Sequence, residues 1–234
     1  MVQRAKLFFS VAILAVLPIS TSLRVHRVEA ATRMSAVALL PQRRGSAAEG
    51  DPRPLLVCFG DSLTAGAGVD PDQAYPADLQ RLLDHDGYAY KVVNEGVSGN
   101  TTKDGIDRLA EVLRLHAQVV VVEFGGNDGL RGLSTTQAQH NLDTMVRQLK
   151  AGGARVAMAG ITLPAQYGGA YIQSFNAMFP TVATRYHVPL LPFILQDVYG
   201  VPGDIQDDGI HATAKGNLQV ALNIEHLVEP LLHK

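Results

Sequence analysis

The sequence contains a single cysteine, Cys58, among 234 residues. One cysteine cannot form an intramolecular disulfide, so packing alone must hold the fold even in an oxidising compartment. Cys58 lies within an apolar run, where a free cysteine behaves as a small buried hydrophobe. We therefore exclude a disulfide-stabilised scaffold.

Charged residues are also scarce, at 18%, whereas hydrophobic residues make up 47% of the chain. A chain of this length and composition can bury a sizeable core, which excludes disorder over most of its length. The net charge is −2, but the first 54 residues carry 8 Lys/Arg and 3 Asp/Glu, so the rest of the chain is acidic. An acidic globular part is poorly suited to gripping phosphate backbones, and we expect no nucleic-acid partner.

The apolar run near the start of the chain is too short for a comfortable membrane span, which needs ~20 residues. It reads LFFSVAILAVLPI, follows Arg4 and Lys6, and gives way to the polar STS at Ser20–Ser22. This order predicts a secretory signal peptide over residues 1–22, with cleavage between positions 22 and 38; an uncleaved anchor is the alternative. We expect an exported protein, periplasmic or secreted, that contacts a membrane only through this segment if it stays uncleaved.

The remainder of the chain divides into a linker and one domain. Residues 23–51 are rich in Arg, Ala, Pro and Gly without a sustained period, which predicts a linker. Over residues 52–234, helical patterns alternate with the short apolar runs LLVCF, YKVVN, QVVVVEF, ARVAMAG and VPLLPF. This alternation predicts an α/β domain in which helices cover both faces of a parallel sheet.

In such a sheet, the loops at the carboxyl ends of the strands meet at one edge, where ligands bind. Ser62 lies in GDSLTAG after the first run, and Asn127 lies in FGGNDGLRG after the third. Asp208 and His211 lie three residues apart in IQDDGIHATAKGN, before the last helical segment. Serine, asparagine, aspartate and histidine at one edge indicate acyl-transfer chemistry.

These residue types suit nucleophilic catalysis better than the alternatives. A serine hydroxyl needs a base to take its proton, for which His211 is the candidate, and Asp208 can orient the imidazole. The glycine-rich turn lacks the Gly-Lys-Ser/Thr of a phosphate-binding loop and the third glycine of a dinucleotide-binding loop. A metal site built from Asp61, Asp207, Asp208 and His211 matches no known ligand spacing, so we expect no metal.

The blocks GDSLTAG, VSGNTT, GGND and DGIH, in this order, resemble those of the GDSL, or SGNH, hydrolases. The segments FGGNDGLRG, VPLLPF and QDDGIH are most similar to the bacterial thioesterase, lysophospholipase and arylesterase group. This resemblance covers nearly all of residues 55–232. It implies a three-layer α/β/α sandwich with a flavodoxin-like, five-stranded parallel sheet.

The resemblance also implies a role for each site residue. Ser62 would be the nucleophile, His211 the base and Asp208 its orienting partner. The oxyanion hole would consist of the backbone N–H groups of Ser62 and Gly99 and the side chain of Asn127. Each residue also has a structural alternative: Ser62 as a helix cap, Gly99 as a left-handed turn and Asn127 as a turn former.

The sequence thus predicts an exported, cofactor-free serine esterase, expected to be a monomer, that acts on carboxylic esters, including thioesters and lysophospholipids. Two alternatives remain open: a carbohydrate O-deacetylase of the same fold and a non-catalytic secreted binding module. Five residues on the same loops are expected to line the acyl groove. They are Leu130, Leu133, Leu163, Pro164 and Tyr167.

Overall fold

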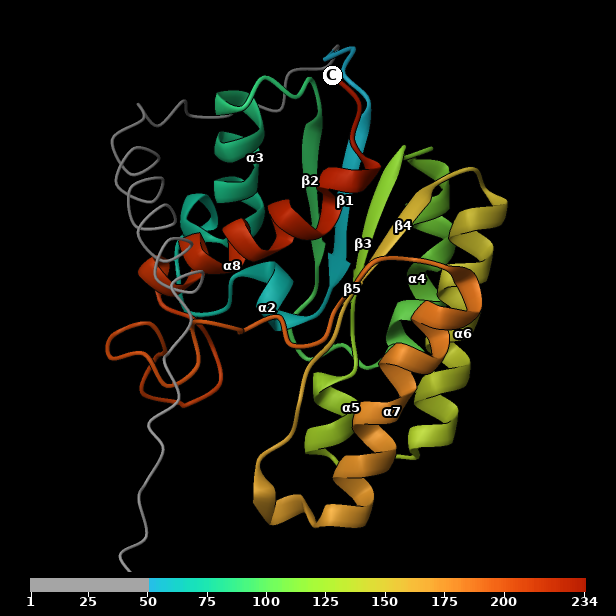
Figure 1. Ribbon diagram of the computed structural model, residues 1–234, viewed down its shortest axis with the longest axis vertical. Coiled ribbons are helices and arrows are strands. Elements are labelled where there is room, and N and C mark those ends of the chain that lie inside the picture. Colours follow the sequence, from blue (N-terminus) through green and yellow to red (C-terminus); the bar gives the residue numbers. More distant parts are fainter. Residues whose placement is uncertain (1–50) are drawn as a thin grey trace, which may run out of the picture.

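The computed structural model describes residues 51–234 (Figure 1). The predicted signal peptide and the predicted linker up to residue 50 lie outside the described residues. Within the described range, no helix is both long enough and apolar enough to cross a membrane.

Five parallel strands form the sheet, in the order β2-β1-β3-β4-β5. The strands are β1 (Leu55–Gly60), β2 (Lys91–Gly96), β3 (Val119–Glu123), β4 (Arg155–Ala159) and β5 (Leu190–Leu191). The central strand β3 reads VVVVE and is buried along its whole length, as expected where helices cover both faces. The predicted five-stranded parallel sheet is therefore confirmed.

The last strand is shorter than the apolar run VPLLPF suggests. Only Leu190 and Leu191 pair with β4, at one edge of the sheet. Pro189 and Pro192 flank this pair, and neither has an N–H to donate to the ladder.

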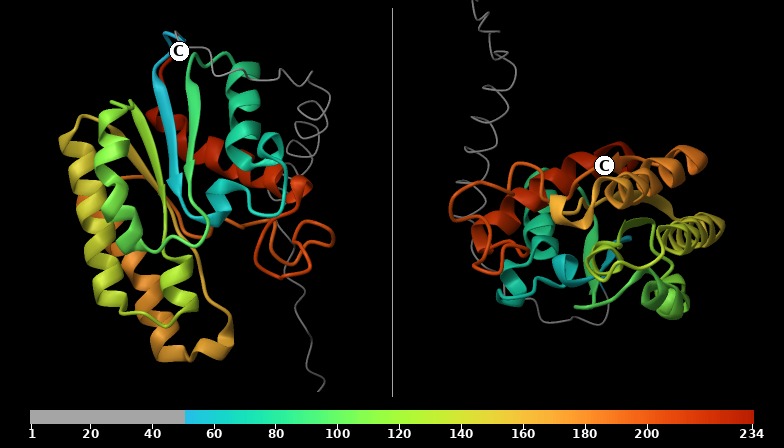
Figure 2. Two further views of the ribbon diagram at one scale, coloured as in Figure 1. Left: turned by 180° about the vertical axis from the view of Figure 1, so that it is seen from behind. Right: turned by 90° about the horizontal axis from the view of Figure 1, so that it is seen from below.

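Helices form a layer on each face of the sheet (Figures 1 and 2). One layer contains α3 (Tyr75–His85) and α8 (Ala214–Val228). The other contains α4 (Thr102–Arg114), α6 (Thr135–Ala151) and α7 (Gly169–Tyr186). The three-layer α/β/α sandwich is confirmed.

Successive residues of β1 point to opposite layers, as the pleat of a strand requires. Leu56 and Cys58 belong to the core under α3 and α8. Val57 and Phe59 belong to the core under α4, α6 and α7. Cys58 is fully buried, and this burial raises the pKa of its thiol to about 12.

Short helical segments occupy several of the connections between the strands and the longer helices. They are α2 (Ser62–Ala65), η1 (Pro71–Gln73), α5 (Gly126–Leu130) and η2 (Ala165–Tyr167). Of these, α2 follows β1 and α5 follows β3, so both lie at the carboxyl edge of the sheet, toward which the strand arrows point in Figure 1. The chain leaves β1 toward β2 on one side, whereas β3 lies on the other, and such a switch point is where open α/β sheets bind ligands.

Candidate active site

Ser62 is placed by a tight turn between β1 and α2. Gly60 ends the strand, and a Cβ at this position would overlap Thr64 Oγ1 and lie 2.7 Å from the backbone oxygen of Glu123. Asp61 then caps α2, because its carboxylate accepts a hydrogen bond from the Leu63 N–H at 3.1 Å. Ser62 is therefore the first residue of the helix and not its cap, and its side chain faces the cavity at this edge.

His211 and Asp208 meet Ser62 in a linear arrangement of three side chains. Ser62 Oγ lies 2.9 Å from His211 Nε2, and His211 Nδ1 lies 2.6 Å from Asp208 Oδ2. The other carboxylate oxygen of Asp208 accepts hydrogen bonds from the backbone N–H groups of Ile210 and His211, at 2.9 and 3.0 Å. The three predicted residues are brought together in the order that proton transfer from a serine requires.

The environment of Asp208 keeps its carboxylate ionised. Partial desolvation acts to raise its pKa. The hydrogen bonds from the His211 side chain and from the backbone of His211 and Ile210 outweigh this effect and hold the pKa at about 2. At neutral pH, Asp208 is therefore an acceptor only, which favours a proton on the neighbouring Nδ1 of His211 and leaves Nε2 to face Ser62.

The loop that carries Asp208 and His211 is closed on itself. Ile205 and Ala212 form an antiparallel bridge, and the Gln206 N–H donates to the His211 carbonyl at 2.8 Å. The Gln206 side-chain amide donates to the carbonyls of Ala212 and Ala67, both at 2.8 Å. Because Ala67 follows α2, Gln206 joins the histidine loop directly to the serine loop.

Of the two other residues of the predicted oxyanion hole, Asn127 lines the cavity together with Ser62, whereas Gly99 is not part of the cavity wall. Gly99 has a φ of 82°, a conformation that favours glycine, and Arg131 donates to its carbonyl at 2.9 Å. Asn127 lies in α5 and lines the same cavity as Ser62. Its amide donates to Asp61 Oδ2 at 3.1 Å and to the Asn100 carbonyl at 3.0 Å. Both amide hydrogens of Asn127 thus already have acceptors. An oxyanion that binds here must displace one of these acceptors or share a hydrogen with it.

Two buried carboxyl groups lie beneath the serine turn. Asp61 and Glu123 are 2% and 1% exposed. Burial raises the pKa of Asp61 to about 6 and the pKa of Glu123 well above its usual range, and their mutual repulsion adds to the effect on Glu123. Glu123 accepts hydrogen bonds from Thr64 Oγ1 at 2.8 Å and from the Asp61 N–H at 3.3 Å. Glu123 therefore supports the serine turn from beneath through these two hydrogen bonds.

A cavity of about 340 Å³ opens beside Ser62 and His211. Three of the five residues expected to line an acyl groove are on its wall: Leu130, Leu163 and Pro164. The other two, Leu133 and Tyr167, are not. Leu133 is exposed, and the Tyr167 hydroxyl donates to the Leu130 carbonyl at 3.1 Å.

Much of the apolar wall of the cavity consists of residues that were not predicted from the sequence. These residues follow β4 and β5 or lie in the histidine loop; they are Ile161, Phe193, Leu195, Tyr199 and Ile210. Phe193 and Ile210 lie within the quoted segments VPLLPF and DGIH, but no motif marks Ile161, Leu195 or Tyr199. Their apolar character suits an alkyl or aryl group better than a carbohydrate.

The chain is similar in sequence and structure to known hydrolases. A model of the GDSL-like lipase/acylhydrolase family matches residues 58–218. Esterase TesA of Pseudomonas aeruginosa is 41% identical over 178 residues, which cover 76% of this chain and 89% of that protein. Thioesterase 1/protease 1/lysophospholipase L1 of Escherichia coli strain K12 is 38% identical over 181 residues, or 76% of this chain and 85% of that protein. A crystal structure of TesA, 41% identical, superposes with a TM-score of 0.73 over 76% of this chain and 99% of that one.

Proposed function

Because this chain belongs to the GDSL-like lipase/acylhydrolase family and is a hydrolase that acts on ester bonds, we propose that it cleaves carboxylic esters through an acyl-enzyme on Ser62. The observation that carries this proposal is the contact of Ser62 Oγ with His211 Nε2 at 2.9 Å, backed by Asp208 at 2.6 Å. A serine that merely caps a helix has no need of a histidine and a carboxylate aligned behind its hydroxyl.

In the first half of the reaction, His211 Nε2 takes the hydroxyl proton as Ser62 Oγ attacks the ester carbonyl carbon. Asp208, ionised at neutral pH, stabilises the imidazolium that forms. The tetrahedral intermediate collapses when His211 gives this proton to the leaving oxygen, and the acyl group stays on Ser62. A water molecule then attacks the acyl carbon while His211 takes its proton, and His211 returns this proton to Ser62 Oγ as the bond between Oγ and the acyl carbon breaks and the acid is released.

The negative charge of the intermediate is assigned to three donors. Ser62 is the first residue of α2, so its N–H has no acceptor within the helix. The N–H of Gly99 has no hydrogen-bond acceptor among the residues that the structure describes. The amide of Asn127 is the third donor, and it serves when the full charge of the oxyanion competes with Asp61 or Asn100 for a hydrogen.

The apolar cavity favours aryl and alkyl esters over carbohydrate acetates. Its walls are formed mainly by aliphatic and aromatic side chains, which would leave sugar hydroxyls without partners. We include thioesters and lysophospholipids in the proposed range, because relatives are named for these activities.

The test is a panel of 4-nitrophenyl esters of graded chain length, assayed with the wild type and with Ser62→Ala. Turnover by the wild type and none by the variant, together with fluorophosphonate labelling of Ser62, is the expected result. Stoichiometric labelling of a different serine would end this mechanism. An inert protein that binds sugars tightly would favour a binding module.

We further propose that the enzyme is exported. The basic start and short apolar run of residues 1–22 support this proposal. When the full-length chain is expressed in a bacterium with an outer membrane, activity should appear in the periplasm or medium. The recovered protein should be shorter by 22 to 38 residues. Full-length protein confined to the membrane fraction would indicate an anchor instead.

A further inference from the structure

Arg108 lies on α4, outside every motif that the sequence analysis singles out, yet it reaches the edge that carries the active site. Its guanidinium carbon lies 4.5 Å from the ring centroid of Phe59 and 5.5 Å from that of Phe124. Phe59 is three residues before Ser62, and Phe124 is three residues before Asn127. The guanidinium thus rests on the ends of the two strands that present these residues.

Two hydrogen bonds extend these contacts to the loops themselves. Arg108 Nη2 donates to the Gly60 carbonyl at 2.7 Å, next to the turn that carries Ser62. Arg108 Nε donates to Asn100 Oδ1 at 2.7 Å, next to Gly99. The Asn100 carbonyl, in turn, accepts from the Asn127 amide at 3.0 Å. One side chain therefore links the three segments that supply the proposed oxyanion donors.

The charge of Arg108 is not neutralised by a close carboxylate. Among the described residues, no acidic group lies within salt-bridge distance of it, and both of its acceptors are neutral oxygens. Burial lowers its pKa, an effect that the more distant Glu95, Glu111 and Asp104 oppose, and the guanidinium remains protonated. Burying half of a cation without an acidic partner costs free energy. An uncharged side chain that joined the same segments would not have this cost.

We propose that Arg108 is a positioning residue for the oxyanion hole: it fixes the Gly60 and Asn100 segments relative to each other and directs positive charge toward the developing oxyanion. This inference rests on the proposed function of Ser62. It accounts for a cation here, because charge that is already in place stabilises the transition state more than the uncharged ester.

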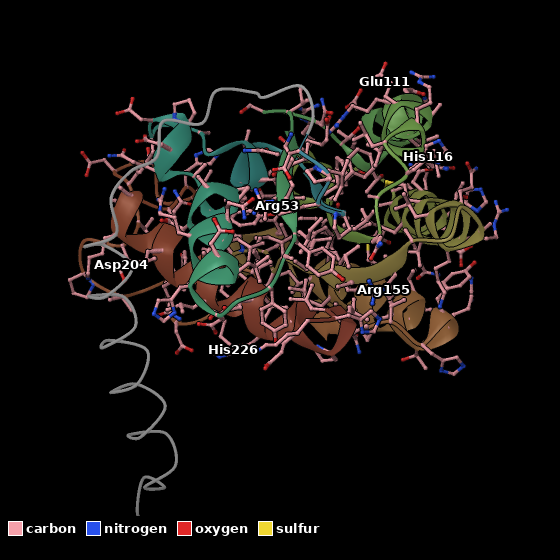
Figure 3. All side chains as sticks on the ribbon, turned by 90° about the horizontal axis from the view of Figure 1, so that it is seen from above. Arg53, Glu111, His116, Arg155, Asp204 and His226 are labelled. Carbon is pink, nitrogen blue, oxygen red and sulfur yellow. The ribbon has the colours of Figure 1, made fainter. Side chains whose placement is uncertain are left out.

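The experiment compares Arg108→Met and Arg108→Lys with Arg155→Met in the full-length enzyme. Arg155 (labelled in Figure 3) is a matched control, because it also donates to neutral oxygens, those of Tyr90 and Gln118. It is the first residue of β4 and therefore lies at the amino ends of the strands, away from the active site. The measurements are kcat and KM for 4-nitrophenyl butanoate, the rate of fluorophosphonate inactivation, and Tm.

For Arg108→Met we expect kcat and the inactivation rate to fall together by roughly 10- to 100-fold, with KM changed only a few-fold. Arg108→Lys keeps the charge but not both hydrogen bonds, so its kcat should lie between those of the wild type and Arg108→Met. Arg155→Met should lower Tm and leave kcat unchanged.

A folded Arg108→Met enzyme with normal kcat and a lowered Tm would overturn the inference, because Arg108 would then be a structural strap. If Arg108→Met does not fold, the same criterion applies to Arg108→Lys. A wild type that hydrolyses no ester would overturn the proposed function, and the inference with it. An active wild type combined with unaffected Arg108 variants would overturn the inference alone.

Discussion

His211 Nε2 lies 2.9 Å from Ser62 Oγ, although 149 positions separate the two residues in the chain. They meet because Ser62 follows the end of β1 and His211 precedes the start of α8, and both of these points lie at the carboxyl ends of the strands. The contact is direct, so the hydroxyl proton needs no intervening group to reach the base.

Replacing Asp208 by asparagine should leave His211 in place but weaken its function. The amide is neutral and can offer a donor to Nδ1, which favours the wrong tautomer at Nε2. We expect kcat to fall by ~10²–10⁴ with Tm nearly unchanged, because Asp208 is largely exposed. Steady-state kinetics and a melting curve on one preparation check this. A variant with wild-type kcat would assign the orientation of the imidazole to another acceptor.

Replacing Asn127 by alanine should remove one oxyanion donor. We expect kcat to fall by ~10²–10³ and KM to change only a few-fold, because the charge on the carbonyl oxygen grows mainly in the transition state. Asn141 provides the control: it is buried and donates to Thr102 Oγ1, away from the cavity lining. Asn141→Ala should lower Tm and spare kcat. The reverse outcome, with Asn127→Ala unstable but fully active, would make Asn127 a turn former.

Enlarging Ile161, on the cavity wall, should shorten the range of accepted acyl chains. Ile161→Phe should lower kcat/KM for dodecanoate esters by about tenfold or more and change the value for acetate esters far less. Leu133→Ala is the control, because Leu133 is exposed and is not part of the wall. Equal losses for both esters with Ile161→Phe would mean that the chain binds elsewhere.

The buried Asp61 should make stability depend on pH. Its native pKa of about 6 exceeds the value of 3.8 expected when it is unfolded, so the native state holds its proton longer. The free energy of unfolding should therefore fall as the pH rises from about 4 to 6, by on the order of 2 kcal/mol. Asp61→Asn should lack this pH-dependent part of the free energy of unfolding. The loss of one hydrogen bond in the variant changes its stability equally at every pH and does not affect the comparison. The free energy of unfolding is measured by urea titration at several pH values between 4 and 7. If it changes with pH equally in the wild type and in Asp61→Asn, the prediction is contradicted.

The sheet and the three aligned side chains are predictable from the sequence for local reasons. Four consecutive valines in β3 have no polar face, which is compatible only with a strand covered on both sides. Ser62, Asp208 and His211 each lie within two residues of a glycine, in polar loops that follow a strand or precede a helix, so the order of strands and helices brings them to one end of the sheet.

What sequence reasoning missed depends on side-chain direction and on distant contacts. Tyr167 follows β4 as expected, but its hydroxyl donates to the Leu130 carbonyl and the residue is not part of the cavity wall. Arg108 sits within an amphipathic helix, where an arginine ordinarily faces solvent. Only the packing of α4 against β1 brings it to Gly60, 48 positions away.

The bridge between Ile205 and Ala212 makes the loop between them a separable unit. Within it, the carboxylate of Asp208 bonds to the ring and to the backbone of His211, so the geometry of the acid–base pair is held by hydrogen bonds inside the loop. The position of this loop relative to Ser62 depends on a different contact, the hydrogen bond from the Gln206 side-chain amide to the Ala67 carbonyl. For protein engineering, residues 205–212 are therefore a cassette. The acid and base can be exchanged together between family members, while position 206 tunes how closely the cassette docks on the serine.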